Sequence, residues 1–323
     1  MPVLRLPLKS TTDLSAIFNR QLRNTSVLSL EPGGIQGFVD VLPLANLKLF
    51  RINLNKPIAI HADRDAGKKI FSLDLSPPSF SHCIRAQGVS LTRSALFGFN
   101  NNLTDMDLVL PVCSDMCAIA VSDNFFLNQL QRFNCLEVLD TLERFNVLAN
   151  SSVSCDLMTT LNQCWAMPCL VNDDVLESEI VVALIQCLMD ANERKVAKPV
   201  SRKDRHNAAL RVLSIAFADP KRPFEVQDLS NLLHQSRTSI FSGCKEKFGM
   251  SPVQVVRSVR LHQVRHALLD LEFSVEKNLN GVVDTAEYFG FVGRSHFAKY
   301  YKSEFMETPR QTLNHRRKAE QIF

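Results

Sequence analysis

One arrangement of apolar and polar positions is repeated near the C-terminus: a short helix, a tight turn and a second amphipathic helix. The two copies cover about residues 226–248 and 282–305. In each copy the second helix carries apolar residues four positions apart, which stack as a stripe on one face of an α-helix. The stripes consist of Ile240, Cys244 and Phe248 in the first copy and of Phe297, Tyr301 and Phe305 in the second. We therefore predict two helix-turn-helix units whose second helices bury these stripes.

The opposite faces of the two second helices are polar and basic. At about 100° per residue, the side chains away from each stripe are expected to face solvent. A helix presented in this way fits the DNA major groove, where its side chains can reach base edges. Single amphipathic hairpins are common in proteins that do not bind DNA, but two copies in one chain favour DNA binding. The predicted DNA-binding residues are Arg237, Thr238, Phe241, Ser242, Lys245, Arg294, Ser295, His296, Lys299 and Lys302.

Small residues give the second copy the more regular pattern. Ala286 is small enough to let two helices touch, and Gly290 can take the positive φ that a sharp interhelical turn requires. Gly243, by contrast, lies inside the second helix of the first copy. At such a position glycine costs about 1 kcal/mol of helix stability relative to alanine.

Between residues 27 and 121 the pattern changes to short apolar runs separated by turn residues, which predicts a β-barrel or a double-sheet sandwich. A short amphipathic helix at about residues 11–24 is expected to brace the surface. Helical spacing returns at 123–150 and again at about 175–191. These two segments either close the core of the sheet domain or leave an apolar stripe for a partner chain.

The length of 323 residues exceeds one typical core, so two domains are expected. A polar, charged stretch at 196–206 is the predicted linker between a sensor and dimerisation domain at 1–195 and a DNA-binding domain at 207–323, in which a helix at about 252–271 connects the two units. The first 199 residues hold 17 basic and 20 acidic side chains, whereas the remainder holds 20 basic and 13 acidic. The basic excess favours a polyanionic partner for the C-terminal part.

Both units resemble those of the AraC/XylS transcription regulators, whose DNA-binding domain contains two helix-turn-helix units joined by a long helix. The matching positions are Ala286, Gly290, Phe291, Ser295, Phe297, Tyr301, Phe305 and Pro309 in the second unit and Leu229, Ser236, Ile240, Phe248, Gly249 and Pro252 in the first. Met306 departs from the family pattern, which has glycine after the last aromatic residue. To a lesser degree, residues 27–121 resemble the cupin-like sensor domain that family members carry before their DNA-binding half.

The resemblance implies a two-domain α+β protein with a β-rich, cupin-like barrel or sandwich, flanking helices and an all-α C-terminal domain. It implies a transcription activator that binds double-stranded DNA and RNA polymerase and forms a homodimer. It also implies a small organic effector in an apolar pocket of the sheet domain, where His82, Arg85 and Arg93 are candidate polar contacts. No cofactor, metal ion or catalytic residue is expected.

Titratable side chains outside the two units have plainer interpretations. His262 and His266 lie one helical turn apart on the connecting helix and are expected to be solvated or to face DNA rather than to bind a metal ion. A basic run follows the last predicted helix and is expected to be a solvated tail that could add phosphate contacts. The run consists of Arg316, Arg317 and Lys318.

The N-terminus lacks the apolar core of a secretion signal, and the longest apolar run is too short to span a membrane, so a cytoplasmic protein is expected. Nine cysteines without matching spacing indicate reduced thiols rather than a disulfide framework. Two other classes stay open. One is a cupin-like enzyme with a helical appendage, and the other is a thiol-based redox-sensing regulator.

Overall fold

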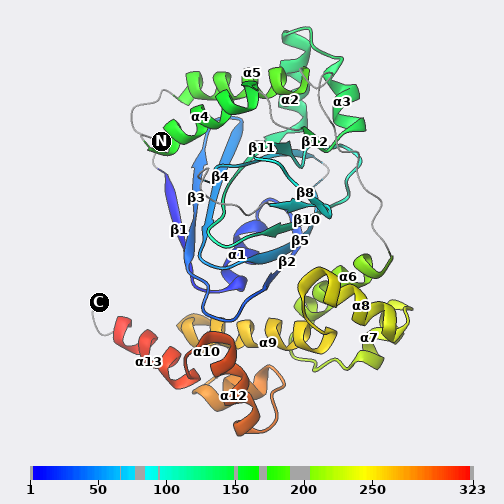
Figure 1. Cartoon of the computed structure of the whole chain (residues 1–323). Helices are drawn as coiled ribbons and strands as arrows, with labels where there is room; N and C mark the ends of the chain where they lie inside the picture. Colours follow the sequence, from blue (N-terminus) through cyan, green and yellow to red (C-terminus); the bar gives the residue numbers. More distant parts are fainter. Residues whose placement is uncertain are drawn as a thin grey trace.

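A computed structural model of the chain describes residues 3–65, 67–76, 84–93, 95–148, 152–166, 173–189 and 204–320. In these residues an N-terminal part, built from two β-sheets and several helices, is followed by a C-terminal part made of helices alone (Figure 1). This arrangement confirms the predicted two-domain α+β fold class.

Both sheets are antiparallel throughout their described pairings. The larger sheet contains, in spatial order, β1 (Leu4–Leu8), β3 (Gly37–Pro43), β4 (Leu47–Leu54), β11 (Asp115–Ser122), β6 (Lys68–Asp74), β9 (Leu96–Phe97) and β12 (Val147–Leu148). The smaller sheet contains β2 (Arg23–Ser29), β5 (Ile58–Asp63), β10 (Asp105–Leu110), β7 (Arg85–Ala86) and β8 (Val89–Ser90).

Strand β11 shows how the larger sheet serves two cores. Its side chains alternate between the two faces of the sheet, as the period of a strand requires. Ile119 and Val121 pack in a core with the helices on one face. Met116 and Ala118 pack in a second core, which also contains residues of the smaller sheet. The two sheets therefore face each other as a sandwich, in agreement with the prediction for residues 27–121.

Four helices cover the outer face of the larger sheet (Figure 1). They are α2 (Asp123–Arg132), α3 (Val138–Arg144), α4 (Ser152–Ala166) and α5 (Asp173–Met189). The predicted helical segment at 123–150 is thus two helices followed by strand β12. Helix α4 was not predicted, because Ser and Thr, which have low helix propensity, interrupt its apolar positions.

Helix α1 (Thr11–Phe18) is amphipathic as predicted but ends before residue 24, since strand β2 begins at Arg23. Leu14 and Phe18, on its buried face, belong to the core between the two sheets. Two cavities lined by residues of this interior each have a volume of about 20 Å³, which is room for one water molecule. Of the candidate effector contacts, Arg85 is exposed and Arg93 is half-buried, whereas His82 lies outside the described residues.

The C-terminal part consists of α6 (Asp204–Ala218), α7 (Val226–Leu233), α8 (Arg237–Phe248), α9 (Pro252–Leu269), α10 (Leu271–Glu276), α11 (Val282–Tyr288), α12 (Arg294–Phe305) and α13 (Pro309–Glu320). Helix α6 begins inside the predicted linker at 196–206, whose residues before 204 lie outside the described part of the chain. None of the described helices is both long and apolar enough to cross a membrane.

The outer face of the smaller sheet packs against the C-terminal helices. Leu28 and Ala59 belong to the same buried cluster as residues of α6 to α9, and Val109 packs against that cluster. Their neighbours in sequence point into the sandwich instead, because side chains alternate along a strand. The molecule is therefore layered, with helices, the larger sheet, the smaller sheet and further helices in that order (Figure 1).

Candidate nucleic-acid interface

The first helix-turn-helix unit consists of α7 and α8, which are joined by a turn at residues 234–236. His234 ends α7 in the left-handed conformation, with a φ of 51°. Ser236 then starts α8, and its Oγ accepts a hydrogen bond of 3.1 Å from the backbone N–H of Ser239. A hydroxyl in this position satisfies one of the N–H groups that a helix start leaves unpaired.

The predicted stripe of α8 is confirmed, since Ile240, Cys244 and Phe248 are all buried. Burial raises the pKa of the Cys244 thiol to about 12. Gly243 lies beside this stripe, where a Cβ atom would collide with the backbone carbonyl oxygen of Arg205 in α6. Gly243, which lowers the stability of an isolated helix, therefore allows α6 and α8 to pack closely.

The predicted outward face of α8 reaches solvent. Thr238, Phe241 and Lys245 are exposed, and Ser242 is half-buried. Arg237 is exposed as well, but its guanidinium is held by α7. Its Nε donates a hydrogen bond of 2.6 Å to Oε1 of Gln227.

The second unit consists of α11 and α12. Gly290 in its turn has a φ of 72°, as predicted. A Cβ atom at this position would also collide with the backbone carbonyl oxygen of Lys221, in the segment between α6 and α7. Glycine is thus required both by the backbone conformation and by the neighbouring chain.

Arg260 of α9 holds this turn in place through hydrogen bonds to its backbone. Its Nε and Nη2 donate hydrogen bonds of 3.0 and 2.7 Å to the carbonyl oxygen of Phe289. Its guanidinium lies 4.2 Å from the ring centroid of Phe291. Burial lowers the pKa of Arg260 to about 10, so the side chain remains charged near neutral pH. A buried arginine whose donors meet a turn carbonyl therefore connects the long helix to the second unit.

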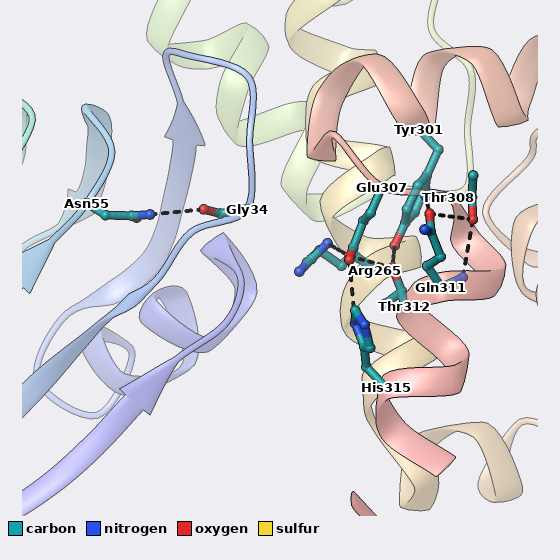
Figure 2. Close-up of polar contacts among 9 residues, drawn as sticks. All are labelled: Gly34, Asn55, Arg265, Tyr301, Glu307, Thr308, Gln311, Thr312 and His315. Atoms are coloured by element: carbon teal, nitrogen blue, oxygen red, sulfur yellow. Dashed lines mark hydrogen bonds and ion pairs between the residues drawn. The ribbon is translucent and has the colours of Figure 1, made fainter. Parts of the chain in front are cut away.

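The stripe of α12 is also buried as predicted, with Phe297, Tyr301 and Phe305 in one cluster. Figure 2 shows how Tyr301 is joined to the last helix: its hydroxyl lies 2.9 Å from Oγ1 of Thr312, which in turn donates a hydrogen bond of 2.6 Å to Glu307. Burial raises the pKa of Tyr301. Glu307 also pairs with Arg265 of α9, so α9, α12 and α13 meet at one polar cluster.

On the outward face of α12, His296, Lys299 and Lys302 are exposed. Arg294 and Ser295 form the first turn of the helix, and their side chains lie outside the described part of the structure. The exposed side chains of α8 and α12 thus include both hydrogen-bonding groups and cations, which are the groups that contact base edges and phosphates.

His262 is not solvated, contrary to the prediction. Its ring is buried, meets the Phe305 ring edge-on at 4.9 Å, and has Nε2 3.5 Å from Oε1 of Glu304. Burial alone would raise the pKa of Glu304, but the interactions with His262 and Ser258 outweigh it and lower this pKa. The prediction of a solvated His262 was wrong because α9 packs against neighbours on almost every side, so this helix has no continuous polar face.

His266 and the basic run also differ from the expectations. His266 Nδ1 lies 3.3 Å from a carboxylate oxygen of Asp13 in α1, so this residue links the two domains. Arg316 belongs to α13 rather than to a tail, and its Nη1 donates a hydrogen bond of 3.2 Å to Ser274. The side chains of Arg317 and Lys318 lie outside the described residues.

The two open alternatives would need a cluster of metal ligands or a reactive thiol. No group of three His, Cys, Asp or Glu residues in the described part of the chain is arranged to hold a metal ion. Burial raises the pKa of Cys117 to about 12 and that of Cys164 to about 11, which keeps these thiols protonated and poorly reactive.

Sequence reasoning missed the residues that hold the units in place. Gln227 and Arg260 are ordinary polar residues in their helices, and Lys247 follows no recognisable motif. Lys247, in the last turn of α8, forms an ion pair with Asp107 of β10, with Nζ–Oδ distances of 2.6 and 2.7 Å. The relation between α8 and β10 depends on tertiary packing, so no local pattern could have indicated this pair.

Comparison with known proteins agrees with this geometry. A family model described as a helix-turn-helix domain matches residues 229–315. Regulatory protein HrpB of Ralstonia nicotianae is 39% identical over 69 residues, which are 21% of this chain and 14% of that protein. The XylDLEGF operon transcriptional activator 2 of Pseudomonas putida is 28% identical over 104 residues, which are 32% of this chain and 64% of that protein. The matches thus span less than two thirds of either relative.

Among solved structures, a probable AraC family transcriptional regulator from Rhodopseudomonas palustris is 29% identical. The likeness covers 34% of this chain and 97% of that one, with a TM-score of 0.31. The family match at 229–315 falls on the part of the chain that contains the two buried stripes and the two outward helix faces. Residues 229–315 of this chain are therefore a helix-turn-helix domain, and the chain is similar in sequence to a probable AraC family transcriptional regulator.

Proposed function

We propose that this chain is a sequence-specific DNA-binding transcription regulator that reads DNA with α8 and α12. One observation carries the proposal: both helices bury their apolar stripe and expose a face of hydroxyl, aromatic and basic side chains. Proteins that read the major groove present a helix in this way. The net positive charge of the C-terminal part favours the same partner.

The two reading helices pack against different segments of α9, an 18-residue helix: α8 shares a buried cluster with its first half and α12 with its second half. We propose that the two helices enter two successive major grooves, which are about 34 Å apart on one face of the duplex. We therefore propose a half-site of nearly two helical turns for each chain.

The contacts divide into two kinds. Arg294, Ser295, His296 and Lys299 are proposed to reach base edges from the beginning of α12, together with three residues of α8. Those three are Thr238, Phe241 and Ser242. Lys245 and Lys302 occur late in their helices and are proposed to contact phosphates, as is Arg237, whose guanidinium is held beside α7.

The N-terminal part is proposed to act as sensor and dimerisation domain of an activator that also contacts RNA polymerase. The matched relative from Pseudomonas putida is itself named a transcriptional activator. Exposed apolar side chains on the helical layer offer a surface for a second copy; these are Leu127, Phe133, Leu136, Val175 and Met189. The two cavities found among the described interior residues hold about 20 Å³ each, so a small organic effector would have to enlarge them to bind there.

The test begins with the full chain and a library of random duplexes, from which the bound fraction is enriched and sequenced. The expected result is a preferred duplex whose affinity falls steeply with salt, because phosphate contacts release counterions. Arg294→Ala should weaken binding to that duplex by about tenfold to a hundredfold and hardly change binding to a scrambled one. Lys302→Ala should weaken both similarly and reduce the salt slope by about one.

Two results would count against the proposal. Absence of any enriched sequence, with the protein folded, would exclude sequence-specific reading. Equal losses on both duplexes for Arg294→Ala would make Arg294 a phosphate contact and would change the proposed placement of α12.

A further inference from the structure

The outward face of α8 exposes an aromatic ring. Phe241 is 47% exposed and is the one exposed phenylalanine among the described residues of the helical part. Thr238 and Lys245 share its face, because they lie three and four positions from Phe241 along the helix, and Ser242 borders this face, four positions from Thr238 and three from Lys245. Since the stripe of Ile240, Cys244 and Phe248 already supplies the buried seam, packing within the unit does not account for this ring.

The rest of this face lacks the side chains that distinguish bases by paired hydrogen bonds. Guanine is read best by arginine or lysine, and adenine by asparagine or glutamine. Arg237 is drawn back to Gln227, and the Gln227 amide donates in turn to Asn231 at 2.7 Å. The amide of Gln235, in the turn, accepts from the Ser239 hydroxyl at 3.3 Å. The nearby arginine and amide groups are therefore engaged within the unit.

Lys245 does not fill this gap. It belongs to the last turn of α8, where its Nζ lies 3.4 Å from the carbonyl oxygen of Gly249. Base contacts in helix-turn-helix proteins come mainly from the first part of the reading helix. Thr238 and Ser242 remain, and hydroxyl groups can bond to several bases, so they discriminate weakly. The strongest chemical feature of the face is then the Phe241 ring.

The major groove offers such a ring one apolar partner on its base edges, which is the C5-methyl group of thymine. We propose that Phe241 is a specificity-determining residue that packs on a thymine methyl, so that α8 selects thymine at one position by apolar contact rather than by paired hydrogen bonds. This inference rests on the proposed function, since it requires that α8 enters the groove. It differs from the expectation for α12, whose first turn carries the arginine at 294.

The expected size of the effect follows from the chemistry. Removing one methyl group from a buried apolar contact should weaken binding about fourfold. Replacing thymine by deoxyuridine removes this methyl group and leaves the hydrogen-bonding groups of the base pair unchanged. The substitution therefore isolates the contact from every other base-specific interaction.

The experiment uses the full chain and the duplex enriched from random sequence. Each thymine is replaced singly by deoxyuridine, and affinities are measured for the unsubstituted chain and for Phe241→Ala. The unsubstituted chain should lose about fourfold at one thymine within the α8 half of the site. Phe241→Ala should bind the thymine and deoxyuridine duplexes equally, because the partner of the methyl group is gone.

A matched control lies one helix earlier. Leu232 of α7 is 46% exposed but is not on the reading face, so Leu232→Ala should keep the full difference between thymine and deoxyuridine. Phe241→Leu retains an apolar side chain and should keep part of it. Thermal unfolding of Phe241→Ala should match that of the unsubstituted chain, because the ring is not part of the buried cluster.

Several outcomes overturn the inference. If no thymine is sensitive to deoxyuridine, or if the sensitive thymine is equally sensitive in Phe241→Ala, the ring does not read a methyl group, whereas the enriched duplex leaves the proposed function standing. If the Phe241 ring instead contacts a protein partner, the Phe241→Ala variant and the unsubstituted chain should respond to deoxyuridine in the same way. Failure to enrich any duplex would overturn the inference and the proposed function together.

Discussion

The two helix-turn-helix units have the same internal plan but are attached to the sheet domain in different ways. The first unit shares a buried apolar cluster with Leu28 and Ala59 of the smaller sheet. It also places Lys247 against Asp107, where the two side chains are only 8% and 2% exposed. The second unit meets the sheet domain through a backbone hydrogen bond, in which the N–H of Gly33 donates to the carbonyl oxygen of Glu304.

This difference indicates which unit the sheet domain can influence. Because apolar burial and a desolvated ion pair are lost when the surfaces separate, the position of α8 is coupled to that of β10. The second unit is positioned mainly by α9, through Arg260 and the cluster around Glu307 (Figure 2). We therefore expect changes in the sheet domain to reach α8 first, and α12 mainly through α9.

Removing Asp107 is the strongest test of the attachment between the first unit and the sheet domain. Asp107→Ala leaves the ammonium group of Lys247 buried without its carboxylate, which should reduce the free energy of unfolding of the full chain by about 3 to 5 kcal/mol. Denaturant unfolding measures the change. The double variant Asp107→Ala/Lys247→Ala should lose less than the sum of the single variants, since the two residues interact directly.

Lys302→Ala is the control in the second unit. That lysine is exposed, so its loss should change the free energy of unfolding by less than about 0.5 kcal/mol. A loss below 1 kcal/mol for Asp107→Ala would mean that the first unit is not tied to the sheet by this ion pair, and the proposed difference between the two units would fail.

Gly243→Ala tests the close packing of α6 and α8 in the first unit. Helix propensity alone would make alanine stabilising by about 1 kcal/mol. The close approach of the Arg205 carbonyl oxygen reverses this sign, so we expect a net loss on the order of 1 to 3 kcal/mol as α6 and α8 are forced apart. Ser242→Ala, at the preceding position, should change the free energy of unfolding by less than about 0.5 kcal/mol. A more stable Gly243→Ala variant would disprove the close packing.

The smallest effects concern how the two reading helices end. Helix α8 ends at Gly249 with a φ of 71°, and α12 ends at Met306 with a φ of 58°. Glycine adopts this conformation without the steric cost that a side chain incurs. Thermal unfolding should therefore show Gly249→Ala destabilised and Met306→Gly stabilised, each by about 1 kcal/mol. Shifts of the same sign would show that these ends are set by contacts rather than by backbone conformation.

The buried seams of both reading helices could be predicted because they depend on a local period. Phe297, Tyr301 and Phe305 recur at the spacing of one helical turn, and burial of one side of a helix leaves that spacing in the sequence whatever lies opposite. The positive φ of Gly290 could be predicted for the same reason, since the backbone of a tight turn limits which residue fits.

Elements that are buried on several sides could not be predicted in this way. Helix α9 packs on both units, so His262 is enclosed although Arg260, Gln263 and Arg265 lie close to it in the sequence. Helix α1 buries one face, as its pattern predicts, but the pattern did not show that Leu14 and Phe18 on this face join the core of the sandwich. A period reports that one face is apolar and does not report what covers the other faces.

The order of a β-rich and a helical part, the two repeated units and the faces of α8 and α12 could be predicted, because each depends on residues close together in the chain. Three contacts depend instead on tertiary packing: Gly243 faces the Arg205 carbonyl, Arg260 holds the turn at Phe289, and Lys247 is buried against Asp107. These contacts join residues 29 to 140 positions apart, and whether they form depends on the packing of whole layers. A local pattern carries no information about such partners, because any exposed lysine, arginine or helical glycine has the same sequence signature.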